Sequence, residues 1–126
     1  MGPLDTVKAA LNAYLTKDRA AIERVIGDSY SFTSPLDNAL DRVTYFARCW
    51  PNSARMTAME LLHGAEAGEH AFIAYEGGTA EKRFRNAELH RVVDGRIVET
   101  QVFFGWDVPH PAPAGDFTEN DGAGHA

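Results

Sequence analysis

Cysteine is almost absent from this sequence, in which Cys49 is the single thiol among 126 residues. One cysteine forms no disulfide within the chain and no cysteine-based metal cluster. Long apolar runs are also missing, since none approaches the roughly 18 residues that a membrane-spanning helix needs. The residues after Met1 lack the basic and apolar regions of a signal peptide. We therefore expect a cytoplasmic protein that does not insert into a membrane.

Basic residues are scarce relative to acidic ones, with 12 Lys and Arg against 18 Asp and Glu and a formal net charge of -6. The residues after Trp106 include four acids and no Lys or Arg, which leaves 14 acids against 12 bases in the body of the chain. Neither part has the basic surface that nucleic acids require. The basic run Lys82-Arg83-Phe84-Arg85 fits the solvated face of a strand. We expect no nucleic-acid partner.

The overall composition, 44% hydrophobic and 24% charged, is that of an ordinary globular chain. A chain of this length forms one domain and buries about two-thirds of its unfolded surface, so its core needs no disulfide or metal. Residues 1–106 are expected to form this domain. Residues 107–126 have three prolines and a Gly-, Asp- and Asn-rich end, which predicts a flexible acidic tail.

Two helices are predicted at the start of the chain. Apolar residues at helical spacing favour a first helix over residues 4–15, with Pro3 suited to its first turn. Asp18 is placed to cap a second helix, and Gly27 is placed to end it. The inner face of this second helix is predicted to consist of Ile22, Val25 and Ile26.

A short strand and a third helix are predicted next. Residues 30–34 alternate as in a strand, and Pro35 is expected to stop it. Asp41 is the expected cap of a third helix, which runs to Trp50 and is followed by Pro51 as a terminator.

The second half of the chain has the pattern of four long antiparallel strands, over residues 55–66, 70–76, 82–93 and 96–106. Gly77 and Gly78 are expected to end the second of these strands, and Asp94-Gly95 predicts a tight hairpin because both residues tolerate positive φ. Helices followed by an antiparallel sheet indicate an α+β fold. A curved sheet wrapped around three helices leaves one open end, and that cavity is a natural ligand site.

Two motifs, together with the order of elements over residues 4–106, carry a family resemblance. The segment from Asp18 to Pro35 reads Asp-x3-Ile-x5-Asp-x5-Ser-Pro, and the segment from Phe84 to Trp106 combines an acid, an Asp-Gly turn and an aromatic-rich end. Both resemble the nuclear transport factor 2-like (NTF2-like) superfamily, in its SnoaL-like and ketosteroid-isomerase-like branch. The resemblance implies a cone-shaped, cystatin-like fold with the sheet around three N-terminal helices. It implies no single activity, because this fold includes isomerases, dehydratases, hydrolases, cyclases and non-catalytic binders.

The catalytic pattern of the ketosteroid isomerases is largely missing from this chain. Those enzymes use an Asp before a Pro as the base, and Ser34 occupies that position here. Their oxyanion donors are a Tyr on the first helix and an Asp on the penultimate strand, where this sequence has Ala10 and Glu88. One of the three groups is kept, in altered form. Ketosteroid isomerisation by that mechanism is therefore not expected.

Three polar residues form the best candidate site in the sequence. Asn86, Glu88 and His90 alternate along one predicted strand and so share a face, and the resemblance implies that this face lines the cone. Strand geometry separates Glu88 and His90 by roughly 6–7 Å. A desolvated carboxyl group can act as an acid or base near neutral pH, and a neighbouring imidazole can share its proton. We interpret Glu88 and His90 as catalytic candidates and Asn86 as a ligand-binding candidate.

A structural alternative remains open for these residues. Glu88 would then pair with an arginine of a neighbouring strand, such as Arg55, and His90 would be a hydrogen-bonded core residue.

Further ligand-binding candidates follow from the phase of helices and strands. These are Tyr14, Phe32, Phe46 and Phe104, with Ser34 at the cavity mouth beside Asp37. Ser34 has no sequence signature that supplies a base for it, so it is also interpretable as a turn residue. Phe103 lies on the opposite face of its strand from Phe104, with Glu99 and Gln101. We expect that face to form a homodimer through the sheet.

No metal and no cofactor is expected, because the histidines show neither His-x-His nor His-x3-His spacing. They are His63, His70, His90, His110 and His125.

One hypothesis is a cofactor-independent isomerase, dehydratase or hydrolase that acts by acid–base catalysis on a small apolar organic molecule. The alternative is a non-catalytic ligand-binding or structural protein of the same superfamily.

Overall fold

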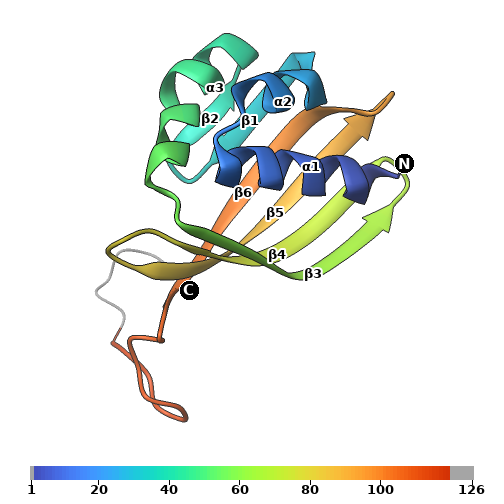
Figure 1. Cartoon of the computed structure of the whole chain (residues 1–126). Coiled ribbons are helices and arrows are strands. Elements are labelled where there is room, and N and C mark those ends of the chain that lie inside the picture. The colour runs from blue at the N-terminus through green and yellow to red at the C-terminus, as the bar shows by residue number, and fades with distance from the viewer. Residues whose placement is uncertain (1, 120–126) are drawn as a thin grey trace.

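One strongly curved sheet forms the wall of the molecule, and helices cover its concave side (Figure 1). The computed structural model describes residues 2–119. Its elements are α1 (Pro3–Thr16), α2 (Arg19–Val25), β1 (Ile26–Ser34), β2 (Asp37–Leu40), α3 (Arg42–Arg48), the 3-10 helix η1 (Trp50–Arg55), β3 (Ala58–Ala67), β4 (His70–Gly78), β5 (Arg83–Val93) and β6 (Arg96–Val108).

The six strands are ordered β2-β1-β6-β5-β4-β3. Neighbouring strands are antiparallel except β1 and β6, which run parallel. The α+β class is confirmed, although the sheet is mixed and contains one strand, β2, beyond the short strand and the four long strands expected from the pattern. Asp94 and Gly95 have φ of 51° and 75° and join β5 to β6, as the Asp-Gly pair predicts.

The helix starts follow from local capping, as expected. Pro3 occupies the first turn of α1, where its missing N–H costs nothing. The side chain of Asp18 accepts the Ala21 N–H at 3.1 Å at the start of α2. The side chain of Asp41 likewise accepts the Thr44 N–H at 2.9 Å at the start of α3.

The predicted helix ends were wrong in two places. Gly27 does not end α2, because Ile26 is already extended and pairs with Ile97 of β6, which places Gly27 inside β1. The third helix stops at Arg48 instead of Trp50, and Pro51 lies within the first turn of η1. Proline suits the start of a helical turn, so it opens η1 here and does not simply terminate α3.

The strands also differ from the expected limits. The short edge strand β2, which the sequence pattern did not predict, pairs with β1. Gly77 and Gly78 continue β4 and pair with Phe84 and Arg83, so they do not end it. The third strand begins only at Ala58, because the residues before it wind into η1, and β6 continues past Trp106 to Val108.

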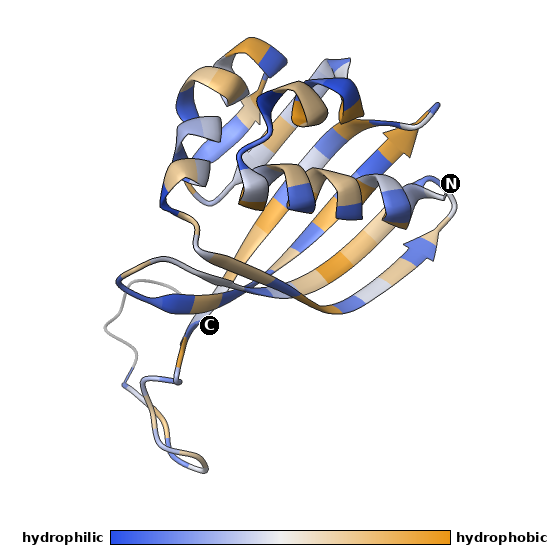
Figure 2. Cartoon of the chain, viewed as in Figure 1, coloured by the Kyte–Doolittle hydropathy of each residue, from blue (hydrophilic) through white to orange (hydrophobic). Residues whose placement is uncertain are grey.

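The core lies between the helices and the concave face of the sheet. Figure 2 shows orange, hydrophobic segments on β4, β5 and β6 beneath α1. Its most buried apolar side chains include Val7, Ala13, Ile22, Ile26, Ile73 and Ile97. Two arginines fasten α2 to this core, since Arg42 and Arg96 both donate to the carbonyl oxygen of Glu23, at 3.0 and 3.3 Å. They satisfy a carbonyl that the end of the helix leaves free.

A bulge bends the end of β6. Phe84 pairs with Asp107 and Asn86 pairs with Phe104, so Gly105 and Trp106 together face the single residue Arg85. The Gly105 N–H donates to the Asn86 side-chain oxygen at 3.3 Å. A Cβ on Gly105 would overlap the carbonyl oxygen of Arg85. Glycine at this position therefore allows the two strands to approach where the sheet curves.

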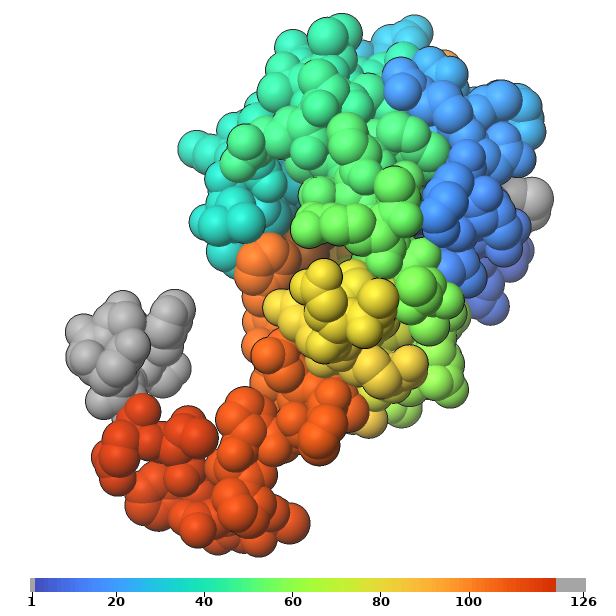
Figure 3. Space-filling model, turned by 60° about the vertical axis from the view of Figure 1, so that its left-hand side comes forward, coloured from blue at the N-terminus to red at the C-terminus, as the bar shows by residue number. Residues whose placement is uncertain are grey.

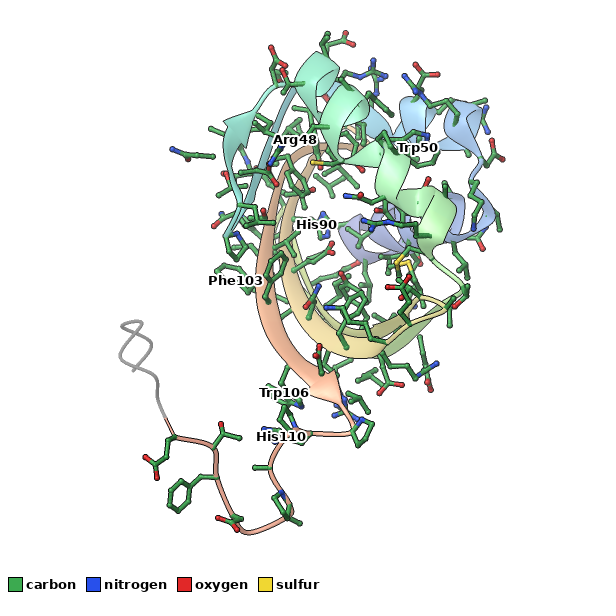
Figure 4. All side chains as sticks on the ribbon, turned by 90° about the vertical axis from the view of Figure 1, so that its left-hand side faces the viewer. Arg48, Trp50, His90, Phe103, Trp106 and His110 are labelled. Carbon is green, nitrogen blue, oxygen red and sulfur yellow. The ribbon has the colours of Figure 1, made fainter. Side chains whose placement is uncertain are left out.

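The convex face of the sheet carries exposed apolar side chains. Phe72 and Phe103 are 47% and 52% exposed, on strands that flank β5. Phe72 pairs with Leu89, and Phe103 pairs with Ala87, so these residues form one apolar patch. Figure 4 shows Phe103 on the outer side of the curved strands.

Residues 109–119 contain no helix or strand and lead away from the body, as the red segment of Figure 3 shows. His110 packs against Trp106, with ring centres 6.1 Å apart, and Phe117 is 72% exposed. Residues 120–126 of the expected tail, including His125, lie outside the described residues. No helix within residues 2–119 has the length and apolar character that a membrane crossing requires.

Gly105→Ala tests the bulge. We expect it to lower the free energy of unfolding by about 1–3 kcal/mol, because the added methyl group has to displace backbone. Gly78→Ala is the matched control, since a Cβ there meets first the flexible Arg83 guanidinium, at 3.4 Å. Urea denaturation of the three proteins measures both effects. An equally small loss for both variants would contradict the close approach at Gly105.

We propose that a second copy of the chain covers the convex patch. Light scattering should then report about twice the 13.8 kDa of one chain. Phe103→Glu should give a monomer, because it places a charge in the buried centre of the contact. Val43→Glu, at a 79% exposed position on α3, should leave the dimer intact. A monomeric parent protein at micromolar concentration would exclude this arrangement.

Candidate functional site

The curved sheet and the helices enclose a cavity of about 660 Å³. Its wall contains residues from α1, β1, β2, α3 and η1 on one side and from β3 to β6 on the other. This volume is in the range that holds small organic ligands in proteins. Candidate residues on the cavity wall would therefore contact such a ligand.

The predicted alternation along β5 agrees with the structure. Phe84, Asn86 and Glu88 line the cavity, whereas Arg83 and Arg91 are exposed on the opposite face. Arg85 is exposed as well, but it also contributes to the cavity wall. Strand side chains alternate between faces, so every second residue of β5 points into the cone.

Glu88 and His90 are in direct contact. His90 Nε2 lies 2.7 Å from Glu88 Oε1, and the two side chains are 5% and 11% exposed. On the far side of the ring, His90 Nδ1 lies 2.9 Å from the hydroxyl oxygen of Thr100. Thr100 faces His90 directly across the β5–β6 pairing. Glu88, His90 and Thr100 thus form one line of hydrogen bonds, and the strand register places Thr100 at its end.

This line of groups runs from the core to the cavity. Glu88 lies on the cavity wall, whereas His90 and Thr100 are each 4% exposed and lie behind it. Figure 4 shows His90 on the inner side of the curved strands. An ionised Glu88 accepts the Nε2–H proton, and Nδ1 then accepts the Thr100 hydroxyl proton. A buried carboxylate held in this way by an imidazole can take up or release one proton.

Arg55 does not pair with Glu88. Its guanidinium group donates to the side-chain oxygen of Asn52 at 2.9 Å. Within residues 2–119, the ion-pair contact of Glu88 is with His90 and with no arginine. Arg55 nevertheless lines the same cavity.

Two tyrosines supply hydroxyl groups to the cavity wall. Burial, followed by the charges of Cys49 and Glu88, raises the pKa of Tyr14 to about 12. Burial and then the charge of Glu88 raise the pKa of Tyr75 far above its usual value. Both phenols therefore keep their protons at neutral pH and can donate hydrogen bonds to a ligand. Tyr75 also accepts a hydrogen bond from the Asn86 side-chain nitrogen at 3.2 Å.

The remaining lining candidates divide into two groups. Phe32, Ser34 and Phe104 line the cavity, whereas Phe46 does not. Phe46 is buried in the helical layer, with the Arg19 guanidinium 4.2 Å from its ring centre. Tyr45, the preceding residue of α3, lines the cavity in its place. A helix of seven residues is too short for its apolar spacing to fix which aromatic ring turns inward.

The polar side chains at the edge strand β2 form hydrogen bonds with one another. The Ser34 hydroxyl donates to Asp37 Oδ2 at 2.9 Å, and the Arg48 Nε–H donates to Asp37 Oδ1. The hydrogen bond from Arg48 holds the pKa of Asp37 below its usual value. Cys49 Sγ lies 4.0 Å from Asp37 Oδ2, and burial raises the pKa of this thiol to about 11. Ser34 thus has a carboxylate partner but no neutral base, and Cys49 is a thiol at neutral pH.

Within the described part of the chain, no three His, Cys, Asp or Glu side chains gather as metal ligands would. His63 and His70 belong to β3 and β4, and His110 follows β6.

Neither a family model nor a curated protein matches this sequence. Solved structures do match it. A protein from Kribbella flavida is 22% identical, with a TM-score of 0.76 over 81% of this chain and 85% of that one. An NTF2-like protein of unknown function from Burkholderia xenovorans is 15% identical, with a TM-score of 0.74 over 89% and 86% of the two chains. The chain has the NTF2-like fold.

Another structural neighbour is an LEH-like epoxide hydrolase of Mycobacterium tuberculosis. It is 17% identical, with a TM-score of 0.69 over 82% of each chain. IdmH of Streptomyces antibioticus, a candidate polyketide cyclase, is 20% identical, with a TM-score of 0.65 over 81% and 91% of the two chains. The predicted superfamily resemblance is confirmed at the level of the fold. Identities this low carry no activity from these proteins to this chain.

Sequence reasoning missed Thr100 and Tyr75 as members of the site. Thr100 would have been found by pairing β5 with β6 through the Asp94-Gly95 turn, which places it opposite His90. Tyr75 lies on the inward face of β4 with Ile73, a position that alternation alone also allows for a core residue.

The pairing of Asp37 with Arg48 predicts a pH-dependent stability. A lowered pKa in the folded state means that the ionised carboxylate stabilises the fold above the unfolded pKa of about 3.9. This contribution is lost as the pH falls through the lower folded value. Asp37→Asn should therefore cost about 1–2 kcal/mol at pH 7, and its difference from the parent should shrink below pH 4.

Urea denaturation at several pH values between 7 and 2 measures this difference. Asp28→Asn is the control, because Asp28 is exposed and has no hydrogen bond or ion pair from its side chain to another described residue. A gap for Asp37→Asn that stays constant across the pH range would contradict the ionic origin of the stabilisation.

Proposed function

We propose that this protein is a cofactor-independent acid–base catalyst of the SnoaL-like type, acting on a small, mostly apolar organic molecule. The reaction class is an isomerisation, a dehydration or a hydrolysis. The observation that carries the proposal is the buried Glu88–His90 pair, 2.7 Å apart, with Glu88 on the wall of a cavity of about 660 Å³.

Glu88 is the proton-transferring group in this proposal. Its carboxylate takes a proton from a carbon of the substrate or from a water molecule, and returns it at another atom. His90 orients the carboxylate through Nε2, and Thr100 fixes the ring from the other side. A positioned partner behind the reacting group is the arrangement that keeps a base in one geometry.

Hydrogen-bond donors face the same space. Tyr14 and Tyr75 lie on the cavity wall, and the charge of Glu88 contributes to the raised pKa of both. A phenol that keeps its proton can stabilise negative charge that develops on a substrate oxygen during proton transfer. Apolar residues such as Phe32 and Met59 surround these groups, which fits an apolar substrate body.

The second candidate is a non-catalytic binder with the same cavity. One observation favours it, because the Glu88 oxygen nearest His90 already accepts a short hydrogen bond and so satisfies part of its need for partners. In this candidate function the pair is structural, and the cavity holds a ligand without changing it.

The base can be tested without knowledge of the natural substrate. 5-Nitrobenzisoxazole loses its C3 proton to a base, its N–O bond breaks, and a coloured cyanonitrophenolate forms. We expect the parent protein to convert it with saturable kinetics, and Glu88→Gln to reduce the rate at least tenfold. His90→Gln keeps a donor beside Glu88 and should keep part of the rate. Glu99→Gln, on the convex side of β6, is the control that should leave the rate unchanged.

Binding of the neutral dye N-phenyl-1-naphthylamine, followed by its fluorescence, separates the two candidate functions. Dye binding with equal rates for the parent and Glu88→Gln would favour the binder and reject Glu88 as a base. A Val102→Trp variant, which fills the cavity wall, should lose both the dye and the reaction.

A further inference from the structure

Arg55 differs from the other cations of the cavity wall. Lys82 lies 3.8 Å from a carboxylate oxygen of Asp107, and Arg85 lies 3.5 Å from one of Glu76. Among residues 2–119, no carboxylate lies within ion-pair distance of Arg55. Arg55 thus lines the cavity as an exposed cation without an ion-pair partner among the described residues.

The guanidinium group of Arg55 is also held in place. It comes from the last residue of η1 and donates to the side-chain oxygen of Asn52 at 2.9 Å, and both residues line the cavity. A guanidinium group has five N–H donors in a rigid plane, and this contact uses one of them. No other hydrogen bond of this side chain is formed within residues 2–119, so the remaining donors are free for a planar, two-point partner such as a carboxylate.

Glu88 and Arg55 carry opposite charges, and both charges affect the pKa of Tyr14. The charge of Glu88 raises the pKa of Tyr14, whereas the charge of Arg55 lowers it. An anionic group in the cavity is repelled by Glu88 and attracted by Arg55, so it settles at η1 and away from β5. The neutral part of the same molecule is then left to face Glu88.

We propose that the ligand of this cavity is an organic acid, whose carboxylate Arg55 binds while its apolar body extends toward Glu88. The inference deepens the proposed function and rests on it, because it concerns the same cavity. A carboxylate fits better than a phosphate ester, since the wall is mainly apolar and supplies a single unpaired guanidinium group. Burying a monoanion beside one cation costs less than burying a dianion there.

A matched pair of probes tests the charge requirement. Naphthalene-2-carboxylate and naphthalene-2-carboxamide have the same shape and differ in charge, and calorimetry measures their dissociation constants. We expect the parent protein to bind the acid at least tenfold more tightly than the amide. Arg55→Gln should weaken acid binding at least tenfold and change amide binding less than twofold. Arg83→Gln removes the same charge from an arginine that does not line the cavity and that Glu76 neutralises, and should change neither.

The outcomes separate this inference from the proposed function. Equal binding of acid and amide, unaffected by Arg55→Gln, overturns the organic-acid assignment and leaves the cavity as a ligand site. Equal weakening of both probes by Arg55→Gln gives the residue a packing role and also overturns the assignment. Binding of neither probe by a folded parent protein counts against the cavity as a ligand site altogether. If Arg55→Gln does not fold, Arg55→Lys replaces it, and tighter binding of the acid than of the amide should survive in reduced form.

Discussion

The pairing of β5 with β6 is the constraint on which the rest of the site depends. It places Thr100 opposite His90 and the bulge residue Gly105 opposite Arg85, and the Asp94-Gly95 turn sets its register. Side chains alternate along a strand, so a shift of one residue would turn Glu88 to the convex face and the neighbouring arginines into the core. The charged residues of β5 are therefore compatible with one register, in which Glu88 contacts His90 and the arginines are exposed to solvent.

The polar groups of the cavity belong to two electrostatic sets. Ser34, Asp37 and Arg48 satisfy one another at the edge strand, and this set stabilises the turn between β1 and β2. Glu88 of β5 and Arg55 of η1 line the same cavity without a contact to this set, and His90 supports Glu88 from behind the wall. Structural and candidate functional charges thus use different carboxylates, and Ser34, at the position of the base in ketosteroid isomerases, belongs to the structural set.

Local features of the sequence predicted the parts of the fold that local interactions determine. The caps Asp18 and Asp41, the Asp94-Gly95 turn and the inward face of β5 depend on a few neighbouring residues, and the structure has them where they were expected. The strand β2, the end of α2 and the inward turn of Tyr45 instead of Phe46 depend on partners distant in the chain. Thr100 belongs with these features, because its role depends on the strand opposite it and on no motif around it.

The parallel pairing of β1 with β6 has a consequence for how the chain is made. Ile26 of β1 pairs with Ile97 of β6, so the ribosome adds this partner about seventy residues after the first strand. Until β6 emerges, β1 pairs with β2 alone, whereas the hairpins from β3 to β6 close between neighbours in the chain. Contacts between distant segments form slowly because loop closure precedes any gain from them. The N-terminal third is thus the part of the nascent protein that lacks its sheet partner longest, and the part on which a chaperone has most time to act.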